Sequence, residues 1–397
     1  SAPVHLEVAK YDLLNRATYI DGPAESIFWE LPVWPLTSRT WSPGASSYIA
    51  NWRLLTQAFP KLLRCAFRAP GLLRQVLSAS EYRYQAASLS GVYRLATLCR
   101  AGTGFDVLHA HFGPAGNSFR FARDLWQAPL VASFHGFDFS TLPRTEGPAM
   151  YEKLFGAADL ITVNSEFTRS RVEQLGCPGG KLRKLPVGLD LGEFPFSERF
   201  RRANEPVRLL TVARLVEIKG HEFTLRAVAK VRENPTELRY DIVGDGPLRR
   251  KLEQLIAELG LQNVVTLQGA RAGAFVRGLM REAHLALLGS VSIEGDQEGQ
   301  GLFLQEAQAC GLPVIATQHG ALPEGLLPGQ SGFLVPERDG AAMVERINFL
   351  IAHPEDWPKM GRQGRAFVAA RYDIRKLNEE LVALYRDLRS GFKNGNP

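Results

Sequence analysis

Two stretches of alternating strand and helix patterns constrain the fold of this chain more than any other feature. Short apolar runs alternate with helical patterns from Phe105 to Val187 and again from Arg208 to Val335, with turn-rich residues 188–200 between them. Parallel strands need such crossover helices, because their connections must return to the same sheet edge. A chain of 397 residues is also long for one core. The sequence therefore predicts an α/β protein with two parallel-sheet domains.

Composition narrows the class of protein. Hydrophobic residues make up 45% and charged residues 22% of the chain, as in ordinary globular proteins, and no run of about 18 apolar residues is long enough to span a membrane. The net charge of +6 favours an anionic partner, and nucleic acid is not expected because no dense basic run contains interleaved aromatics. Four cysteines are far apart without metal-ligand spacing, which fits a reducing cytoplasm: Cys65, Cys99, Cys177 and Cys310.

Residues 44–100 have apolar side chains at helical spacing, and we expect Pro60 and Pro70-Gly71 to cut this stretch into separate helices. This stretch contains one acidic residue, Glu81, and many basic ones, which are Arg53, Lys61, Arg64, Arg68, Arg74, Arg83, Arg94 and Arg100. Two interpretations are open. These helices either pack on a core with solvated basic faces, or rest a basic, apolar face on an anionic membrane or a lipid-linked acceptor.

The segment Glu298–Thr317, EGQGLFLQEAQACGLPVIAT, predicts an anion site. A helix is expected to begin near Leu302 after the flexible Gly301, and its free N–H groups and dipole favour a phosphate. Two carboxylates, Glu298 and Glu306, would repel a phosphate and are better suited to accepting hydrogen bonds from hydroxyls. A phosphate with hydroxyls on both sides suggests a nucleotide-sugar. The alternative is an ordinary amphipathic helix with one N-terminal acid.

Polar residues also follow the predicted strands of the first half. His111, His135 and Asp138 lie where ligands of parallel sheets bind, at the carboxyl ends of strands. We predict that His109 and His111 point to opposite faces of their strand, so that only His111 faces a cleft. A structural histidine is the alternative for His135, and a cap is the alternative to an acceptor contact for Asp138.

In the second half, Arg214 and Lys219 follow a predicted strand and could hold a diphosphate without a metal, together with the helix start near Leu302. Ordinary solvated charges are the alternative. Gly244 opens the turn 244–247, GDGP, which we interpret mainly as a tight turn with Pro247 in the first helical position.

Together these motifs resemble the retaining glycosyltransferases of family four, which have the GT-B fold, from Phe105 to the C-terminus. The resemblance is carried by the following motifs, the most specific first: E-x7-E from Glu298 to Glu306 with 309–314 ACGLPV, then 212–215 VARL with Lys219-Gly220, and 243–247 VGDGP. Residues 109–114 HAHFGP and 134–138 FHGFD look more narrowly like bacterial exopolysaccharide enzymes, such as the colanic acid transferase group.

The resemblance implies two Rossmann-like domains that face a cleft. Residues 1–187 would form the acceptor-side domain, with residues 372–397 crossing back onto it, and residues 188–371 the nucleotide-sugar domain. Members of this family open with a strand, a glycine loop and a helix, and we expect the N-terminal domain of this chain to lack that first strand and loop.

The resemblance also implies roles for the candidate residues. Ribose hydroxyls would bind Glu306, donor-sugar hydroxyls Glu298 and His135, and the diphosphate Arg214 and Lys219. The backbone from Gly269 to Arg271 would meet the base.

We therefore predict a cytoplasmic glycosyltransferase, associated with the inner face of the plasma membrane. It would move a hexose, with retention, from a nucleoside-diphosphate sugar to a carbohydrate or lipid-linked oligosaccharide in exopolysaccharide synthesis, without a metal or cofactor. Alternatives are a nucleotide-sugar epimerase or a nicotinamide dehydrogenase on the same scaffold, although the dehydrogenase glycine motif is missing, and a non-catalytic sugar-nucleotide or polysaccharide-binding protein.

Overall fold

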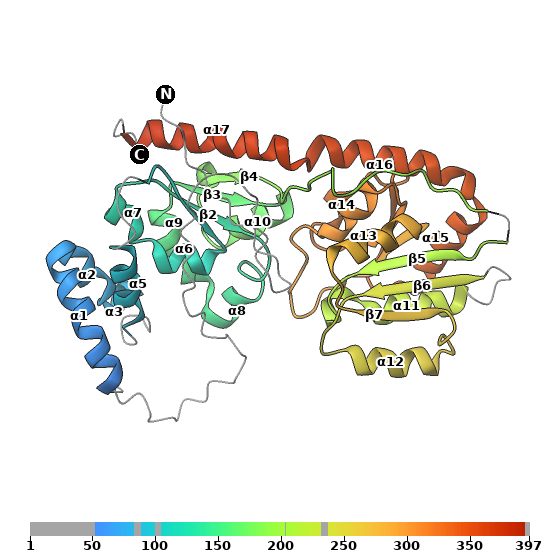
Figure 1. Cartoon of the computed structure of the whole chain (residues 1–397), viewed down its shortest axis with the longest axis horizontal. Coiled ribbons are helices and arrows are strands. Elements are labelled where there is room, and N and C mark those ends of the chain that lie inside the picture. The colour runs from blue at the N-terminus through green and yellow to red at the C-terminus, as the bar shows by residue number, and fades with distance from the viewer. Residues whose placement is uncertain (1–51, 83–88, 100–104, 203, 232–236, 394–397) are drawn as a thin grey trace.

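The computed structural model describes residues 52–82, 89–99, 105–202, 204–231 and 237–393. They form two α/β domains, side by side along the long axis of the molecule (Figure 1). Each domain is built on one all-parallel sheet, as the alternating pattern predicted. Among the described residues, no helix combines the length and apolar composition needed to cross a lipid bilayer.

The N-terminal sheet has the strand order β1-β2-β3-β4, which follows the chain. Every residue of β2 is buried, because helices cover both faces of the sheet. The strands are β1 (Leu108–His111), β2 (Leu130–Phe134), β3 (Leu160–Val163) and β4 (Leu182–Lys184). The helices between them are α6 (Gly113–Phe119), α7 (Ala122–Trp126), α8 (Leu142–Glu146), η1 (Pro148–Tyr151), α9 (Glu152–Ala157), α10 (Glu166–Gln174) and η2 (Gly179–Lys181).

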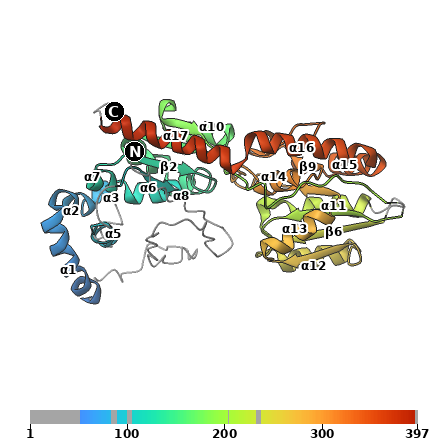
Figure 2. The ribbon, with the colours of Figure 1, turned by 45° about the horizontal axis from the view of Figure 1, so that its top comes forward.

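In the described part of residues 52–99, helices precede this sheet, as the apolar spacing predicted: α1 (Trp52–Arg68), α2 (Pro70–Val76), α3 (Ala79–Tyr82) and α5 (Ser90–Leu98). Pro60 lies inside α1, so the prediction that it ends a helix was wrong, whereas Pro70 begins α2. The helices bury a small core that contains Cys65, Val76 and Leu95. Figure 2 shows them at the end of the molecule farthest from the C-terminal domain.

The C-terminal sheet has the order β10-β9-β8-β5-β6-β7. Its strands are β5 (Val207–Val212), β6 (Leu238–Val243), β7 (Val265–Gly269), β8 (Leu285–Leu288), β9 (Val314–Thr317) and β10 (Gly332–Val335). Its helices are η3 (Glu217–Lys219), α11 (His221–Val231), α12 (Arg249–Glu258), α13 (Gly273–Glu282), α14 (Leu302–Ala309), η4 (Leu322–Gly325), α15 (Gly340–Ala352), η5 (Pro354–Asp356), α16 (Trp357–Arg371) and α17 (Ile374–Lys393).

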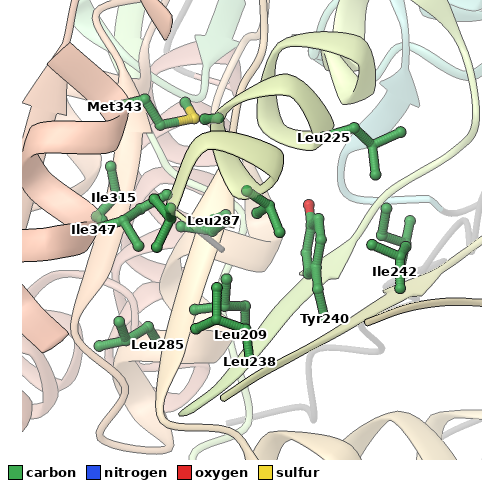
Figure 3. Packing of buried hydrophobic residues seen from close by; sticks show 14 of the residues in the cluster. Leu209, Leu225, Leu238, Tyr240, Ile242, Leu285, Leu287, Ile315, Met343 and Ile347 are labelled. Atoms are coloured by element: carbon green, nitrogen blue, oxygen red, sulfur yellow. The ribbon is translucent and has the colours of Figure 1, made fainter. Parts of the chain in front are cut away.

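Apolar side chains from the sheet and from α11 pack together in the largest core, where Leu225 and Ile242 lie beside the Tyr240 ring (Figure 3). Tyr240 is 1% exposed. Its hydroxyl is 2.7 Å from Thr211 Oγ1 and 3.1 Å from Thr224 Oγ1, so the buried polar group is satisfied.

The strand order places a topological switch point between β5 and β8. The chain runs from β5 outward to β6 and β7, and then returns to build β8, β9 and β10 on the other side of β5. In such sheets ligands bind at the carboxyl ends of the strands beside the switch point, so the loops after β5 and β8 are where a ligand is expected.

Helix α17 leaves the C-terminal domain and runs along the N-terminal one (Figures 1 and 2). Leu381 and Tyr385 pack against Val131 and Leu160 of the N-terminal sheet. At the other side of the boundary, the Glu324 carboxylate accepts hydrogen bonds from the Glu166 and Phe167 N–H groups at the start of α10, at 2.9 and 2.8 Å. The division at residues 187 and 188 stays a prediction.

Helix α12 begins at Arg249, so the prediction that Pro247 occupies its first position was wrong. Helix α6 begins at Gly113, and α15, α16 and α17 follow β10. The expectation of a missing first strand and glycine loop falls on residues 1–51, which lie outside the described part of the chain.

Candidate active site

The two domains touch where the loop after β8 meets the loop after β2. The Gly299 backbone passes so close to the N-terminal domain that a Cβ there would lie 2.2 Å from the His135 carbonyl oxygen. The Ser140 hydroxyl donates to the Asp296 carboxylate at 2.5 Å, and the Arg171 guanidinium donates to Gln297 at 2.6 Å. The carboxyl ends of the two sheets therefore face each other at this point.

The Glu298 carboxylate lies beside this contact and is 12% exposed. It accepts a hydrogen bond from the Lys219 ammonium at 2.5 Å and one from the Ser290 hydroxyl at 3.0 Å. Burial acts to raise the pKa of Glu298, but the positive charge and hydrogen bond of Lys219, together with His319 and Ser290, outweigh burial and lower it below 4.5. Glu298 is therefore ionised at neutral pH.

A second layer, which our sequence reasoning missed, fixes the Glu298 backbone. The Glu298 N–H donates to His319 Nε2 at 3.0 Å, and His319 Nδ1 lies 2.8 Å from the Glu337 carboxylate. This geometry places the proton of a neutral His319 on Nδ1. His319 lies two residues after the end of β9, so the rule that sites gather at carboxyl ends of strands would have found it.

Close approach of two loops explains the place of Lys219. Gly220 has a φ of +61°, and a Cβ there would lie 1.8 Å from the Gly289 carbonyl oxygen, so only glycine fits. This crossing brings the loop after β5 against the loop after β8 and sets Lys219 beside Glu298. Arg214 is exposed, and its carbonyl accepts from His221 Nε2 at 2.9 Å.

Helix α14 begins at Leu302, as predicted, with Gly301 in the left-handed region at φ +74°. No side chain caps its first turn, and Leu302 is 44% exposed. Glu306, four residues on, lies on the same helix face and is half-buried. The N–H groups of the first turn of α14 and the Glu306 side chain therefore both lie on the β8 side of the switch point.

The residues predicted to meet the nucleotide lie after β6 and β7. The Gly244 N–H donates to the Gly269 carbonyl at 2.9 Å, and a Cβ on Gly244 would lie 1.9 Å from the Ala213 carbonyl oxygen. The tight-turn interpretation of Gly244 therefore fits its contacts. Arg271 is exposed and stacks its guanidinium 5.0 Å from the centre of the Phe275 ring.

Three histidines stack across the N-terminal sheet. The rings of His109 and His111 lie 4.5 Å apart, and the prediction that they face opposite sides of β1 was wrong, because residues two apart on a strand share a face. His111 Nδ1 lies 3.2 Å from His135 Nε2. His109 Nε2 lies 2.6 Å from the Ser133 hydroxyl, and its Nδ1 contacts the Tyr385 hydroxyl.

Burial keeps this histidine stack neutral. It lowers the pKa of His111, and together with the charge of neighbouring histidines it lowers the pKa of His109 to about 3 and that of His135 to about 4. Neutral imidazoles each offer one donor and one acceptor. At neutral pH His135 can therefore exchange hydrogen bonds with a ligand without carrying charge.

Asp138 has the contacts of a cap. It is 0% exposed, and its carboxylate accepts from the N–H groups of Gly113, His135 and Gly136 at 3.1, 3.1 and 2.8 Å. Burial raises the pKa of Asp138, against the lowering effect of these hydrogen bonds. The carboxylate is fully buried and its hydrogen bonds go to backbone groups of its own domain, so it does not face an acceptor.

This constellation, in two parallel-sheet domains that meet at the carboxyl ends of their strands, defines a GT-B glycosyltransferase. Residues 54–193 match the family model described as Glycosyltransferase Family 4, and residues 195–367 match that described as Glycosyl transferases group 1. The chain belongs to the glycosyltransferase family that these two models describe together.

Similar proteins and solved structures agree with this family assignment. The chain is 32% identical over 288 residues to the putative colanic acid biosynthesis glycosyltransferase WcaL of Escherichia coli, covering 71% of each protein. It is 32% identical over 243 residues to the amylovoran biosynthesis glycosyltransferase AmsK of Erwinia amylovora, covering 60% of each. Its fold matches Anabaena HepE in complex with UDP, with a TM-score of 0.64 at 22% identity over 71% of this chain and 79% of that one.

Removing the positive partner of Glu298 should destabilise the protein. We expect Lys219→Met to lower the free energy of unfolding by about 3 kcal/mol at neutral pH, because it leaves a buried carboxylate unpaired. Adding Glu298→Gln should recover most of the loss. Urea denaturation measures both, with Lys230→Met, at an exposed site on α11, as the control. A Lys219→Met variant as stable as the control would contradict the importance of the pair.

The histidine stack should make stability fall in acid. Because the folded-state pKa values lie below 6.5, the unfolded chain binds protons that the folded chain refuses, so stability is present above about pH 6.5 and is lost as pH falls toward about 4. Each pH unit in this window should cost roughly 1.4 kcal/mol per neutral histidine. Urea denaturation at several pH values should give a shallower slope for His109→Gln than for the exposed-site control His353→Gln. Equal slopes would show that His109 is not part of the effect.

Proposed function

We propose that this protein is a retaining transferase that moves a hexose from a nucleoside-diphosphate sugar to a carbohydrate or lipid-linked oligosaccharide acceptor. The observation that carries the proposal is Glu298, an ionised and nearly buried carboxylate beside the contact between Gly299 and His135. Hydroxyl groups of a sugar are suitable partners for such a carboxylate, because it accepts hydrogen bonds and needs no proton of its own.

The donor would lie along the switch point of the C-terminal sheet. Glu298 and His135 would bind the hexose, and Glu306 the ribose. The N–H groups at Gly301 and Leu302 would bind a phosphate. Gly244, Gly269 and Arg271, which follow the next two strands, would meet the rest of the nucleotide.

Arg214 and Lys219 would offset the charge of the diphosphate. Lys219 can do so while it holds Glu298, because an ammonium group has three N–H donors. With the start of α14 these cations supply the stabilisation that a metal ion supplies elsewhere, so we infer metal-independent transfer.

Retention of configuration at the anomeric carbon fits a front-side displacement. In this step the leaving phosphate itself accepts the proton of the acceptor hydroxyl. The bond from the anomeric carbon to the phosphate oxygen would break as the bond to the acceptor oxygen forms on the same face. Glu298 has no proton to give, since its pKa is lowered, so it fits hydroxyl binding better than the acid role in a glycosidase pair.

The named relatives in colanic acid and amylovoran synthesis support a role in exopolysaccharide synthesis, and HepE supports a nucleotide donor. The epimerase, the dehydrogenase and the non-catalytic binding protein are not favoured by these matches. A cytoplasmic location is part of the proposal.

A donor screen tests this function. We expect one of the UDP-, GDP- or ADP-sugars to raise the melting temperature, because a ligand at 100 times its Kd adds about 2.7 kcal/mol of stability. Glu306→Ala should abolish this shift, and His135→Ala should keep a shift with free nucleoside diphosphate but lose turnover. The matched control is Glu258→Ala, at an exposed position on α12. Tight nucleotide binding with no turnover of any donor would reject the transferase.

We also propose that α1 rests on an anionic membrane. Phe59, Leu63 and Phe67 recur every fourth residue on one face and are 61%, 46% and 85% exposed. Lys61, Arg64 and Arg68 are interspersed among them. Exposed apolar residues with interleaved bases favour insertion at an anionic lipid surface.

Vesicle sedimentation tests this contact. Phosphatidylglycerol vesicles should bind the wild type several-fold better than phosphatidylcholine vesicles, and Phe59→Ser with Phe67→Ser should remove most of the binding, because both lose their apolar anchor. Phe200→Ser is the control, since Phe200 is 63% exposed in the segment between the domains. Equal sedimentation of the double variant and the control would argue against α1 as the contact.

A further inference from the structure

Phe137 is exposed in a loop whose next three residues are buried. Its side chain is 44% exposed, while Asp138, Phe139 and Ser140, which follow it, are 0%, 5% and 7% exposed. The loop begins at His135, which touches Gly299, and it ends at Ser140, which donates to Asp296 of the facing domain. Phe137 therefore lies near the boundary between the domains, and the residues that the structure describes leave nearly half of its side chain exposed.

A second phenylalanine extends this surface to His135. The Phe112 ring lies 5.2 Å from the Phe137 ring and 4.8 Å from the His135 ring, measured between ring centres. The three rings come from the carboxyl ends of β1 and β2, and the His135 backbone contacts Gly299 of the facing domain. They form one aromatic cluster that includes the residue proposed to bind the donor sugar.

The backbone of Phe112 is held in an unfavourable conformation. Its φ of +71° with ψ 136° lies in a region that residues other than glycine rarely adopt. Asp138 helps to hold this conformation. Its carboxylate accepts from the N–H groups of Gly113, His135 and Gly136, and so links the loop after β1 to the loop after β2. This link holds the backbone of Phe112 close to that of His135. Unfavourable backbone conformations of this kind are common at ligand-binding sites.

We propose that Phe112 and Phe137 form an acceptor subsite that binds the C–H face of a pyranose ring; this rests on the proposed transferase function. An aromatic face is electron-rich, so it attracts the polarised C–H groups of a sugar while the sugar hydroxyls stay in water. The acceptor is the partner that fits, because the proposed donor groups other than His135, among them Glu298, Glu306 and Lys219, lie on the facing domain. This subsite replaces Asp138 as the acceptor contact on this domain.

Acceptor kinetics with simple glycosides test the subsite. With the donor found by thermal shift, nucleoside diphosphate release is measured with and without methyl α- and β-hexopyranosides, and with octyl glucoside as an apolar probe. Phe137→Ala should raise the KM for the stimulating methyl glycoside about fivefold to tenfold, while the KM for the donor changes less than twofold. Phe137→Trp should restore the acceptor KM, and Phe137→Leu should not, because leucine is apolar but lacks a ring face.

The matched control is Phe105→Ala. Phe105 is 42% exposed on the same domain but precedes β1, at the opposite ends of the strands, so its replacement should leave the acceptor KM at the wild-type value. Full rescue by Phe137→Leu, with an effect seen only for octyl glucoside, would indicate an alkyl chain and overturn the sugar subsite. A wild type that turns over donor but is stimulated by no glycoside would overturn it too. No turnover of any donor would instead reject the proposed function itself.

Discussion

A carboxylate that is 12% exposed needs a positive partner, and Lys219 provides it for Glu298. The pair joins loops from the two sides of the switch point, because Lys219 follows β5 and Glu298 follows β8. The crossing of Gly220 over Gly289 makes the approach sterically available. On the other side, His319 and Glu337 hold the Glu298 backbone in place. The position of the ionised carboxylate is thus set by several independent contacts.

The same loop connects the domains. Gly299, next to Glu298, packs on the His135 carbonyl, which also accepts from the Asn164 side-chain amide at 3.0 Å. Helix α17 and the cap that Glu324 places on α10 add contacts on the N-terminal domain. The groups proposed to bind one hexose therefore come from both domains, and their spacing depends on how these contacts hold the two domains together.

Sequence reasoning succeeded where one physical cause leaves a clear pattern. Parallel strands buried on both faces, such as β2 and β9, read as apolar runs, and these runs predicted the two parallel-sheet domains. Ser165 is a typical capping residue at the start of α10, and its hydroxyl accepts from the Thr168 N–H at 3.0 Å. Helices α6 and α12 begin after Phe112 and Leu248, which make no side-chain cap, so their starts left no signal in the sequence.

By itself the sequence determined the two α/β domains, the positions of Glu298 and Lys219 after their strands, and the resemblance to a glycosyltransferase family that the comparisons confirm. Only the tertiary structure decided which groups meet. The Glu298–Lys219 pair spans 79 residues, the histidine stack joins β1, β2 and α17, and Asp138 turns inward instead of facing a ligand. Such contacts depend on strand order and on the close approach of glycine backbones, and neither is encoded in local periodicity.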